Sequence, residues 1–591
     1  MARNRYDVDE VLETPFDFAH LKRSFVYIKK YKGKMITALM LSVFAAISGL
    51  LGPLITQYAL DNTIPQKNMG QLVLLTLAFV GTIAVSITFS TIRSRIMTVV
   101  GQDIIFDIRT DLFKHLQELP FEYYDNRPHG KILIRVVNYV NSVSDMLSNG
   151  IINVILECLN MLFIMIFMFF VNVKLSLVVL SGLPIFAVIM MMIKKRQRKA
   201  WQDVSNKSSN LNAYLQENIT GARVTQIFTR EEENAQIFDR LSEKYRKSWI
   251  NAVKYSNLVW PATDNVSTLV RAAIFVVGLL VLTPAAVSLG TIVAMTSYAS
   301  SFWQPIMNLS NIFNNFINNI ASLERIFETL DEPATIADKP NAQDIGDITG
   351  EVKFDDVTFS YEQGKTVLEH ISFDVKPGES VALVGPTGAG KSTVVSLLSR
   401  FYDLDSGKIT IDGKDISQAT LHSLRSQMGI MLQDSFIFSG TIYDNIRYGR
   451  LDATEEEIRE AAKIVCADEF INEMKDGYMT EVNERGSKLS GGQKQLISFA
   501  RTLLSDPKIL VLDEATSSID ARTEKLLQQG LQRLLVGRTS FIIAHRLSTI
   551  KNCDKIMYID NKGIAECGTH DQLIAKKGEY YKLYTAQHMD E

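Results

Sequence analysis

Six long apolar runs occupy the first half of the chain, and polar segments separate them. The runs cover residues 35–60, 72–92, 151–171, 175–193, 258–282 and 291–312. Each run approaches or exceeds the about 20 residues that a helix needs to cross about 30 Å of hydrocarbon. Six such runs in succession predict a membrane domain of six transmembrane helices rather than the buried helices of a soluble protein.

Positive charge is spread unevenly over the loops between these runs. The loops after the second and fourth runs are long and basic, whereas the three short loops carry only Lys67 and Lys174. By the positive-inside rule, the long loops and the N-terminus face the cytoplasm. Before the first run, FDFAHLKRSFVYIKKYKGK mixes aromatic residues with lysines. This mixture predicts an amphipathic elbow helix that lies on the inner membrane surface.

The two long inner loops have apolar residues at helical spacing along much of their length. The membrane helices are therefore expected to continue into the cytoplasm. Each pair of extended helices is expected to end in a short turn, near 121–126 and near 220–229. Such tips can press on another domain.

Several polar side chains lie within the apolar runs. Glu157 and Arg271 fall at similar depths, about thirteen and eleven residues from the outer ends of their runs. Either they form an intramembrane ion pair or each finds a separate partner. In the sixth run, one helical face carries Asn308, Asn311, Asn315 and Asn318. This stripe either lines a wet cavity or forms hydrogen bonds between helices.

The second half of the chain has a different pattern. After a polar linker at 329–350, short β-rich runs alternate with helical patterns, which predicts an α/β domain over 351–591. The expected fold is thus a cytoplasmic segment at 1–34, a membrane α-helical domain of six helices at 35–328, and this α/β domain. The chain of 591 residues is long enough for these two domains.

Net charge and cysteine content exclude other classes of protein. The formal net charge of −3 gives no indication of a nucleic-acid partner. The four cysteines, Cys158, Cys466, Cys553 and Cys567, are not at metal-ligand spacing. They predict reduced thiols in the core rather than a disulfide framework.

A phosphate-binding loop is encoded in VALVGPTGAGKSTVVSLL, which predicts a strand, a loop and a helix. The segment Gly385–Ser392 fits G-x-x-x-x-G-K-S, in which backbone N–H groups and the helix N-terminus bind phosphates. Lys391 is predicted to contact the β- and γ-phosphates, and Ser392 to bind magnesium. The predicted ATP-binding residues here are Gly385, Pro386, Thr387, Gly388, Ala389, Gly390, Lys391, Ser392 and Thr393.

Two further strands end in residues suited to ATP hydrolysis. KILVLDEATSSID predicts a buried strand that ends at Asp513, a magnesium position, followed by Glu514, which is placed to orient or deprotonate the attacking water. FIIAHRLSTI predicts a strand followed by His545, which can contact the γ-phosphate and the water. Upstream, Tyr361 is placed to stack on adenine.

The order of these motifs resembles a known family. The phosphate loop, LSGGQ at 489–493, the acidic strand end and the final histidine resemble the ATP-binding cassette. Six membrane helices with long inner loops, fused before such a cassette, resemble a half-transporter of the ABC exporter superfamily. The resemblance covers nearly the whole chain and implies an ATP-hydrolysing translocase that uses ATP and Mg²⁺.

The resemblance also implies roles for residues outside the phosphate loop. GIMLQDSFIFSG resembles the Q-loop, which implies that Gln433 contacts magnesium and senses the membrane domain. TEVNERG resembles the X-loop, with Glu484 near the inner-loop tips, and SSID resembles the D-loop, with Asp520 reaching across a dimer of cassettes. The tips near 123–124 and 221–227 are the implied coupling helices.

The LSGGQ stretch lies about a hundred residues after the phosphate loop, and the resemblance explains this distance. In this family the stretch closes over the ATP of the opposite cassette, so that two ATP molecules are held head to tail. The implied contacts come from Ser490, Gly491, Gly492 and Gln493. ATP then holds the dimer together, and hydrolysis loosens it while the membrane cavity switches from inside to outside access.

The second chain of the dimer is either another copy of this chain or a different half-transporter. An intact LSGGQ and Glu514 allow a homodimer with two competent sites. The sequences QLISFAR and SSID resemble those of the catalytically competent half of bacterial heterodimeric exporters, and this resemblance favours a heterodimer.

The implied function is ATP-driven efflux of amphipathic small molecules, above all drugs, across a bacterial cytoplasmic membrane. A flippase of lipids or lipid-linked glycans is the alternative within the same class. An ATP-gated channel or sensor is a more distant one, and Glu514 favours steady turnover over gating.

Overall fold

The computed structural model describes residues 18–125, 127, 129–281, 287–362, 364–431, 435–483, 486–513, 521–543 and 550–590. The chain divides into two compact units. The helical unit holds residues 1–115 and 129–332, and the α/β unit holds residues 116–128 and 333–591.

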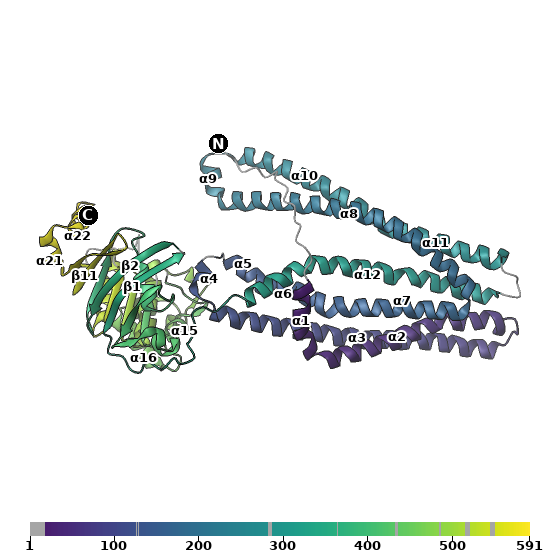
Figure 1. The fold of residues 1–591 in the computed structure, drawn as a ribbon, viewed down its shortest axis with the longest axis horizontal. Coiled ribbons are helices and arrows are strands. Elements are labelled where there is room, and N and C mark those ends of the chain that lie inside the picture. Colours follow the sequence, from purple (N-terminus) through teal and green to yellow (C-terminus); the bar gives the residue numbers. More distant parts are fainter. Residues whose placement is uncertain are drawn as a thin grey trace. The chain divides into compact units, whose positions relative to one another are not determined.

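The helical unit consists of long helices that lie side by side and of a few short helices between them (Figure 1). They are α1 (Phe18–Lys30), α2 (Lys32–Tyr58), α3 (Met69–Glu118), α5 (His129–Ile134), α6 (Val140–Asp145), α7 (Ile151–Val171), α8 (Val173–Thr220), α9 (Ala222–Ile227), α10 (Glu231–Asn257), α11 (Val259–Val276) and α12 (Leu289–Leu330). Single π-helical turns at Ala59–Thr63, Arg135–Tyr139, Met146–Gly150 and Val277–Val281 extend their neighbours. The short helix α9 lies where α8 and α10 meet, at the second predicted tip.

The predicted apolar runs fall on these helices and on the turns that join or extend them, and position 282, at the end of the fifth run, lies outside the described residues. Five described helices are long and apolar enough to cross a membrane. The sixth run lies in α12, a continuous helix of 42 residues that is less apolar because serine, threonine and glutamine side chains interrupt it. The helices α3 and α8 continue well beyond their apolar runs, as the spacing of apolar residues in the inner loops predicts, and α12 also extends beyond the sixth run.

The predicted elbow helix is α1, and its polar face is bound to α3. Lys34, in the first turn of α2, pairs with Asp103 at 2.8 Å, and Lys30, the last residue of α1, pairs with Asp107 at 2.7 Å. One turn further along α3, Asp111 accepts a hydrogen bond of 3.1 Å from the hydroxyl of Tyr27. Residues 103, 107 and 111 are spaced by four and therefore share one face of α3. The lysines that suggested a surface helix thus bind a row of aspartates.

The intramembrane ion pair between Glu157 and Arg271 is not present, so that alternative is wrong. Glu157 accepts a hydrogen bond of 2.7 Å from Nδ2 of Asn308 on α12. Arg271 donates to the hydroxyl of Thr268 at 2.8 Å and lies 3.9 Å from Asp264. Each residue has found a separate partner, and the asparagine stripe contributes a hydrogen bond between α7 and α12.

The four cysteines are free thiols. Only Cys553 is buried, Cys466 is partly buried, and Cys158 and Cys567 are exposed. The expectation of four thiols in the core is therefore wrong, because only one of them lies inside the packed interior of the α/β unit.

Two sheets and a small hairpin form the α/β unit. The antiparallel sheet has the order β2-β1-β4-β5, the larger sheet has the order β12-β11-β3-β10-β9-β6, and β7 pairs with β8. The strands are β1 (Val352–Glu362), β2 (Lys365–Val375), β3 (Ser380–Val384), β4 (Ser406–Ile411), β5 (Lys414–Asp415), β6 (Met428–Met431), β7 (Gly440–Thr441), β8 (Glu481–Val482), β9 (Ile509–Asp513), β10 (Thr539–Ile543), β11 (Lys555–Asp560) and β12 (Gly563–Gly568).

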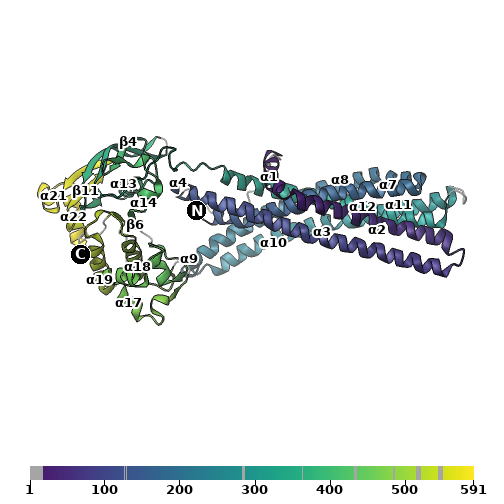
Figure 2. The ribbon, with the colours of Figure 1, turned by 90° about the horizontal axis from the view of Figure 1, so that it is seen from below.

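The α/β unit also has helices, some of which cover the two faces of the larger sheet. They are α4 (Phe121–Asp125), α13 (Lys391–Leu398), α14 (Leu421–Arg425), α15 (Ile442–Arg447), α16 (Glu455–Ile464), α17 (Asp468–Glu473), α18 (Gly491–Leu504), α19 (Ala521–Leu535), α21 (His570–Lys576) and α22 (Glu579–Asp590), with 3₁₀ turns at Ile416–Gln418 and Gly477–Met479. Alternate residues of β10 face opposite cores: Ile542 packs with α18 and α19, and Phe541 packs with α13. Figure 2 shows α13 and α14 on one side of β6 and α18 and α19 on the other.

The central strands of the larger sheet run parallel and end at the same level. Ile543 of β10 is level with Leu383 of β3 on one side and with Asp513 of β9 on the other. The carboxyl ends of parallel strands are where open α/β sheets bind ligands. The loop after β3 and the acid that ends β9 therefore meet at one edge.

Candidate nucleotide-binding site

The loop between β3 and α13 has a backbone that only glycine accommodates. Gly385 has a φ of +141°, and a Cβ added there would lie 2.1 Å from the carbonyl oxygen of Ile559. Gly390, directly before α13, has a φ of +103°, and its Cβ would lie 2.6 Å from Leu368. Residues 386–388 between them are exposed. The loop is thus an open cradle at the N-terminus of α13, as a phosphate site requires.

Replacing Gly385 with alanine is expected to lower the free energy of unfolding of the α/β unit by about 2–4 kcal/mol, because the new methyl group collides with a backbone oxygen. The matched control is Gly413→Ala, where φ is +75° and the space around the Cβ is open. That variant should cost only about 1 kcal/mol of backbone strain. The check is the midpoint of thermal unfolding of both purified variants. Equal midpoints would show that contact with Ile559 does not constrain the loop.

Lys391 turns its side chain back over the loop. Its Nζ donates to the carbonyl oxygens of Gly385 at 2.9 Å and Pro386 at 2.8 Å, and only 8 % of the residue is exposed. Burial lowers the pKa of Lys391, and the nearby Asp513 carboxylate partly offsets this effect. The ammonium group is therefore desolvated, held at the loop and satisfied by neutral oxygens, which a phosphate oxygen can replace.

Two candidate magnesium ligands are close to this lysine in the fold. Ser392 is exposed in the first turn of α13, and Asp513 ends the neighbouring strand β9. In the sheet, Asp513 is level with Ile543 of β10, which in turn is level with Leu383 of β3, two residues before the loop begins at position 385. A hydroxyl and a carboxylate beside a phosphate cradle are oxygen ligands of the kind that Mg²⁺ prefers. The donor set therefore fits a magnesium-nucleotide complex.

Tyr361 lies beside the start of α13, as expected for a residue that contacts a nucleotide base. Its hydroxyl is 3.1 Å from Oγ1 of Thr393. Its ring packs edge-on against Phe359 and Tyr402, with centroid distances of 4.8 and 5.1 Å. The ring is still 43 % exposed, which leaves a face for stacking.

The LSGGQ stretch forms the N-terminus of α18. Ser490 accepts a hydrogen bond of 3.2 Å from the backbone of Gln493, whose Oε1 accepts one of 2.9 Å from the backbone of Ser490. A Cβ added to Gly491 would meet nothing within 4 Å, whereas Gly492 is buried. Within the described part of this unit, no hydrogen bond joins this turn to the phosphate loop. The chain's own packing therefore gives no reason for glycine at 491.

Several predicted functional residues lie outside the described residues. They are Gln433, Glu484, Glu514, Asp520 and His545. Their neighbours in sequence are nevertheless placed: β9 ends one residue before Glu514, and β10 ends two residues before His545. Their roles stay predictions.

The sequence reasoning missed the residues that follow α13. The ring of Phe401 packs on Phe121 of α4 at a centroid distance of 4.4 Å, and the hydroxyl of Tyr402 donates to Asp125 at 2.8 Å. Beside them is a cavity of about 430 Å³. Its lining includes Glu122 of α4 together with the candidate nucleotide residues Tyr361 and Ser392. The first predicted tip is thus a helix packed close to the phosphate loop. The feature of the sequence that could have indicated this contact is the pair of aromatic residues shortly after α13.

The fold and the site together define a class of protein. Apolar helices long enough to span a membrane are joined in one chain to an α/β unit that holds a phosphate-binding loop. The helical part matches the ABC transporter transmembrane region over residues 35–306, and the α/β part matches the ABC transporter family over residues 368–517. The chain belongs to the ABC transporter family, as an exporter half-transporter with an ATP-hydrolysing cassette.

Similar proteins share this layout over almost their full length. The chain is 41 % identical to the ABC transporter ATP-binding protein YknV of Bacillus subtilis, over 100 % of this chain and 98 % of that protein. It is 35 % identical to YgaD of the same organism, a protein named for multidrug export, over 96 % of this chain and 100 % of that one. It is 37 % identical to a fatty acid ABC transporter of Mycobacterium bovis, over 84 % and 78 %.

The solved structures include a similar fold. A bacterial Atm1-family ABC exporter with ATP bound matches with a TM-score of 0.78 and 28 % identity, over 94 % of this chain and 98 % of that one. The predicted family, fold class and ATP-hydrolysing activity are confirmed by these matches.

Proposed function

We propose that the chain is one half of a bacterial exporter that uses ATP to expel amphipathic small molecules, drugs among them, across the cytoplasmic membrane. A polar pocket among the apolar helices supports this cargo class most directly. A relative named for multidrug export, similar over its whole length, supports it as well.

The pocket lies between α2, α3 and α7 and has a volume of about 230 Å³. Its polar lining comprises Ser42, Ser86, Ser90, Arg93, Glu157 and Asn160, and its apolar lining includes Val43, Leu156, Leu159 and Phe163. Nε of Arg93 is buried without a hydrogen-bond partner among the described residues. Glu157 lies fourteen residues before the end of α7, about 21 Å along the helix. The carboxylate is therefore in the inner half of the bilayer, where an amphiphile can leave the inner leaflet with its polar end in the pocket.

ATP supplies the free energy, and the chain's own residues bind and position it. Lys391 and the N–H groups of the phosphate loop hold the phosphates, and Tyr361 stacks on the base. Ser392, Asp513 and Gln433 hold Mg²⁺. Glu514 accepts a proton from the attacking water, and His545 contacts the γ-phosphate.

A second cassette completes each site in this proposal. Ser490, Gly491 and Gly492 of one chain bind the ATP held by the other chain, with Gln493 and Asp520 beside them. The open space at Gly491 and the exposed N-terminus of α18 support such an approach by an anion from outside. We favour a heterodimer with a second half-transporter over a homodimer, because the sequences QLISFAR and SSID resemble those of heterodimeric exporters.

The test is transport by the purified chain in proteoliposomes, alone and with a candidate second half-transporter, with an amphipathic fluorescent dye as the probe. ATP, but not ADP, is expected to drive dye movement across the bilayer. ATP-driven movement of a fluorescent phospholipid without dye movement would favour the flippase alternative. Stable ohmic currents induced by ATP would contradict a pump. Oligomer mass, measured in the same preparation, separates a homodimer from an inactive chain that needs another partner.

A matched pair of variants tests the pocket in the same assay. Arg93→Gln is expected to reduce the dye-stimulated part of the ATPase rate by about 10-fold, because one charge-assisted contact contributes about 1.5 kcal/mol or more. Arg95→Gln should retain that stimulation, because residues two apart on a helix do not share a face and Arg95 does not line the pocket. Equal losses in both variants would remove this pocket from the cargo pathway.

A further inference from the structure

The residue that follows the phosphate-loop helix is a buried arginine with an unusual backbone. Arg400 comes two residues after the end of α13, has a φ of +49°, and has a side chain that is only 2 % exposed. A left-handed backbone is strained for a non-glycine residue. A buried guanidinium also needs acceptors for its five N–H groups. Local strain and burial of this kind persist where the surroundings hold the residue in place.

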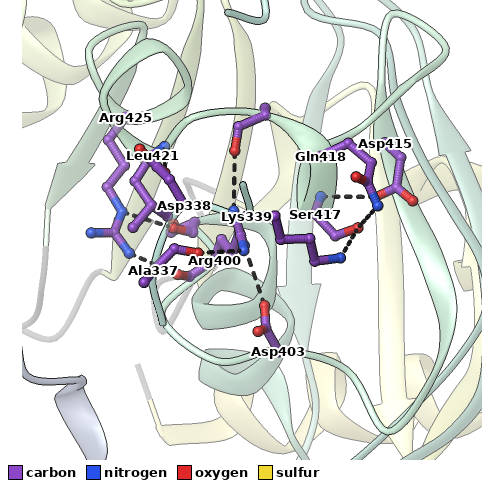
Figure 3. A network of polar contacts seen from close by, with 12 residues as sticks. Ala337, Asp338, Lys339, Arg400, Asp403, Asp415, Ser417, Gln418, Leu421 and Arg425 are labelled. Carbon is purple, nitrogen blue, oxygen red and sulfur yellow. Dashed lines mark hydrogen bonds and ion pairs between the residues drawn. The ribbon is translucent and has the colours of Figure 1, made fainter. Parts of the chain in front are cut away.

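The guanidinium of Arg400 joins three separate segments (Figure 3). Its Nε donates to Asp403 at 3.2 Å, and NH1 donates to the carbonyl oxygen of Ala419 at 3.1 Å. Its NH2 donates to the carbonyl oxygen of Ala337 at 3.2 Å. Ala337 lies in the linker, seven residues after the last residue of α12. One side chain at the end of the phosphate-loop helix therefore holds the chain that arrives from the last membrane helix.

Other polar contacts fix the linker at the same place. Asp338 accepts a hydrogen bond of 2.7 Å from the backbone of Leu421, and Lys339 donates to Ser417 at 3.2 Å. Further along, Gln343 exchanges backbone hydrogen bonds with Gln418 and with residue 420. These bonds attach the linker to residues 417–421, whereas only Arg400 attaches it to the end of α13 among the described contacts.

The opposite side of the same short segment holds α4. Arg400 is followed by Phe401, which packs on Phe121, and by Tyr402, which binds Asp125. Arg425 also binds this segment, because its NH2 donates to the carbonyl oxygen of Arg400 at 2.7 Å. The end of α13 thus contacts both α4, which follows α3, and the linker, which follows α12. The eight-residue helix α13 begins at Lys391, so it connects the phosphate cradle with both contacts.

We propose that Arg400 is a positioning residue that couples the phosphate-loop helix to α12 through the linker, as a path distinct from the contact of α4 with Phe401 and Tyr402. A movement of α13 on nucleotide binding carries Arg400 and, through it, the carbonyl of Ala337. Lysine cannot replace this role, because one ammonium group lacks the fork that reaches three acceptors in different directions. The role concerns the transmission of nucleotide binding and does not depend on which cargo is exported.

The test compares Arg400→Gln with Arg538→Gln in the full-length protein in lipid. Arg538 is the matched control because it also donates to backbone carbonyls and to one carboxylate, far along the chain from the linker. Its acceptors are the carbonyl oxygens of Pro507, Leu534 and Val536 and the carboxylate of Asp506. Hydrogen exchange of α12 and of residues 333–343 is measured with and without a saturating non-hydrolysable ATP analogue. ATP-analogue affinity is measured in parallel.

Arg400→Gln is expected to bind the analogue within about 2-fold of the wild type, while the analogue-induced change in exchange of α12 falls at least about 3-fold. Arg400→Lys should not restore that change, and Arg538→Gln should keep it. An unaltered response of α12 in Arg400→Gln, or equal losses in both arginine variants, would overturn the proposal. If Arg400→Gln does not assemble, Arg400→Lys, which keeps the positive charge, is measured in its place. A normal α12 response in Arg400→Lys would then overturn the proposal.

Discussion

Replacing Lys391 with alanine is expected to weaken ATP binding by about 30- to 100-fold and to reduce hydrolysis at least as much. The reason is geometric as well as electrostatic. The ammonium group lies over the loop and donates to the carbonyl oxygens of Gly385 and Pro386, and it is desolvated by burial. A charge-assisted hydrogen bond to a phosphate in such surroundings contributes about 2–3 kcal/mol, which corresponds to that range of affinity.

The measurement is the dissociation constant of a non-hydrolysable ATP analogue for the full-length protein in lipid, with the thermal midpoint as a check on folding. Lys463→Ala, in the last turn of α16, is the control, because it removes an exposed lysine from the same unit. Wild-type affinity in Lys391→Ala would contradict the assignment of the phosphate loop. A lowered thermal midpoint together with lost binding would indicate that the lysine acts on the loop's conformation instead.

Much of the fold could be predicted because its signals are local. Apolar runs as long as a bilayer is thick predict helices, and the run at 151–171 coincides with α7. The loop from Gly385 to Ser392 could be predicted because phosphate binding places glycines, a lysine and a hydroxyl at fixed spacing within one turn. Asp513 could be placed because parallel strands bring their carboxyl ends together.

Contacts between distant segments could not be predicted in the same way. Depth along a helix suggested that Glu157 faces Arg271, but depth does not specify rotation about the helix axis, and Glu157 instead binds Asn308. Two of the three acceptors of Arg400 are backbone carbonyls, and the residue types at 337 and 419 give no indication of these hydrogen bonds. The binding of α1 to the aspartates of α3 likewise depends on which helices become neighbours.

Replacing Glu514 with glutamine is expected to lower the rate of ATP hydrolysis by about 10²- to 10⁴-fold while ATP binding is retained. Glutamine has nearly the shape of glutamate but cannot accept a proton from the attacking water, and general-base catalysis contributes a factor of this size. The residue follows Asp513, which is level with the end of β10, the strand that lies beside β3 and its phosphate loop. The phosphate cradle, Lys391 and the magnesium ligands remain, so affinity for the nucleotide should stay within a few-fold of the wild type.

The same variant tests whether LSGGQ serves the ATP of another chain. When hydrolysis stops, ATP should keep the two cassettes together. The population of the closed dimer should therefore rise with ATP concentration in Glu514→Gln. It should not rise in the double variant that carries both Glu514→Gln and Ser490→Arg. Phosphate release and the distance between the two cassettes are the measurements, and Glu456→Gln, an exposed acid in the first turn of α16, is the control. Unchanged turnover in Glu514→Gln would remove that residue from the catalytic role. Lost turnover without ATP-dependent closure of the purified chain would mean that its LSGGQ stretch requires a different half-transporter. The stretch forms capping hydrogen bonds only within itself among the described residues, so a second cassette has to bring the phosphate that it binds.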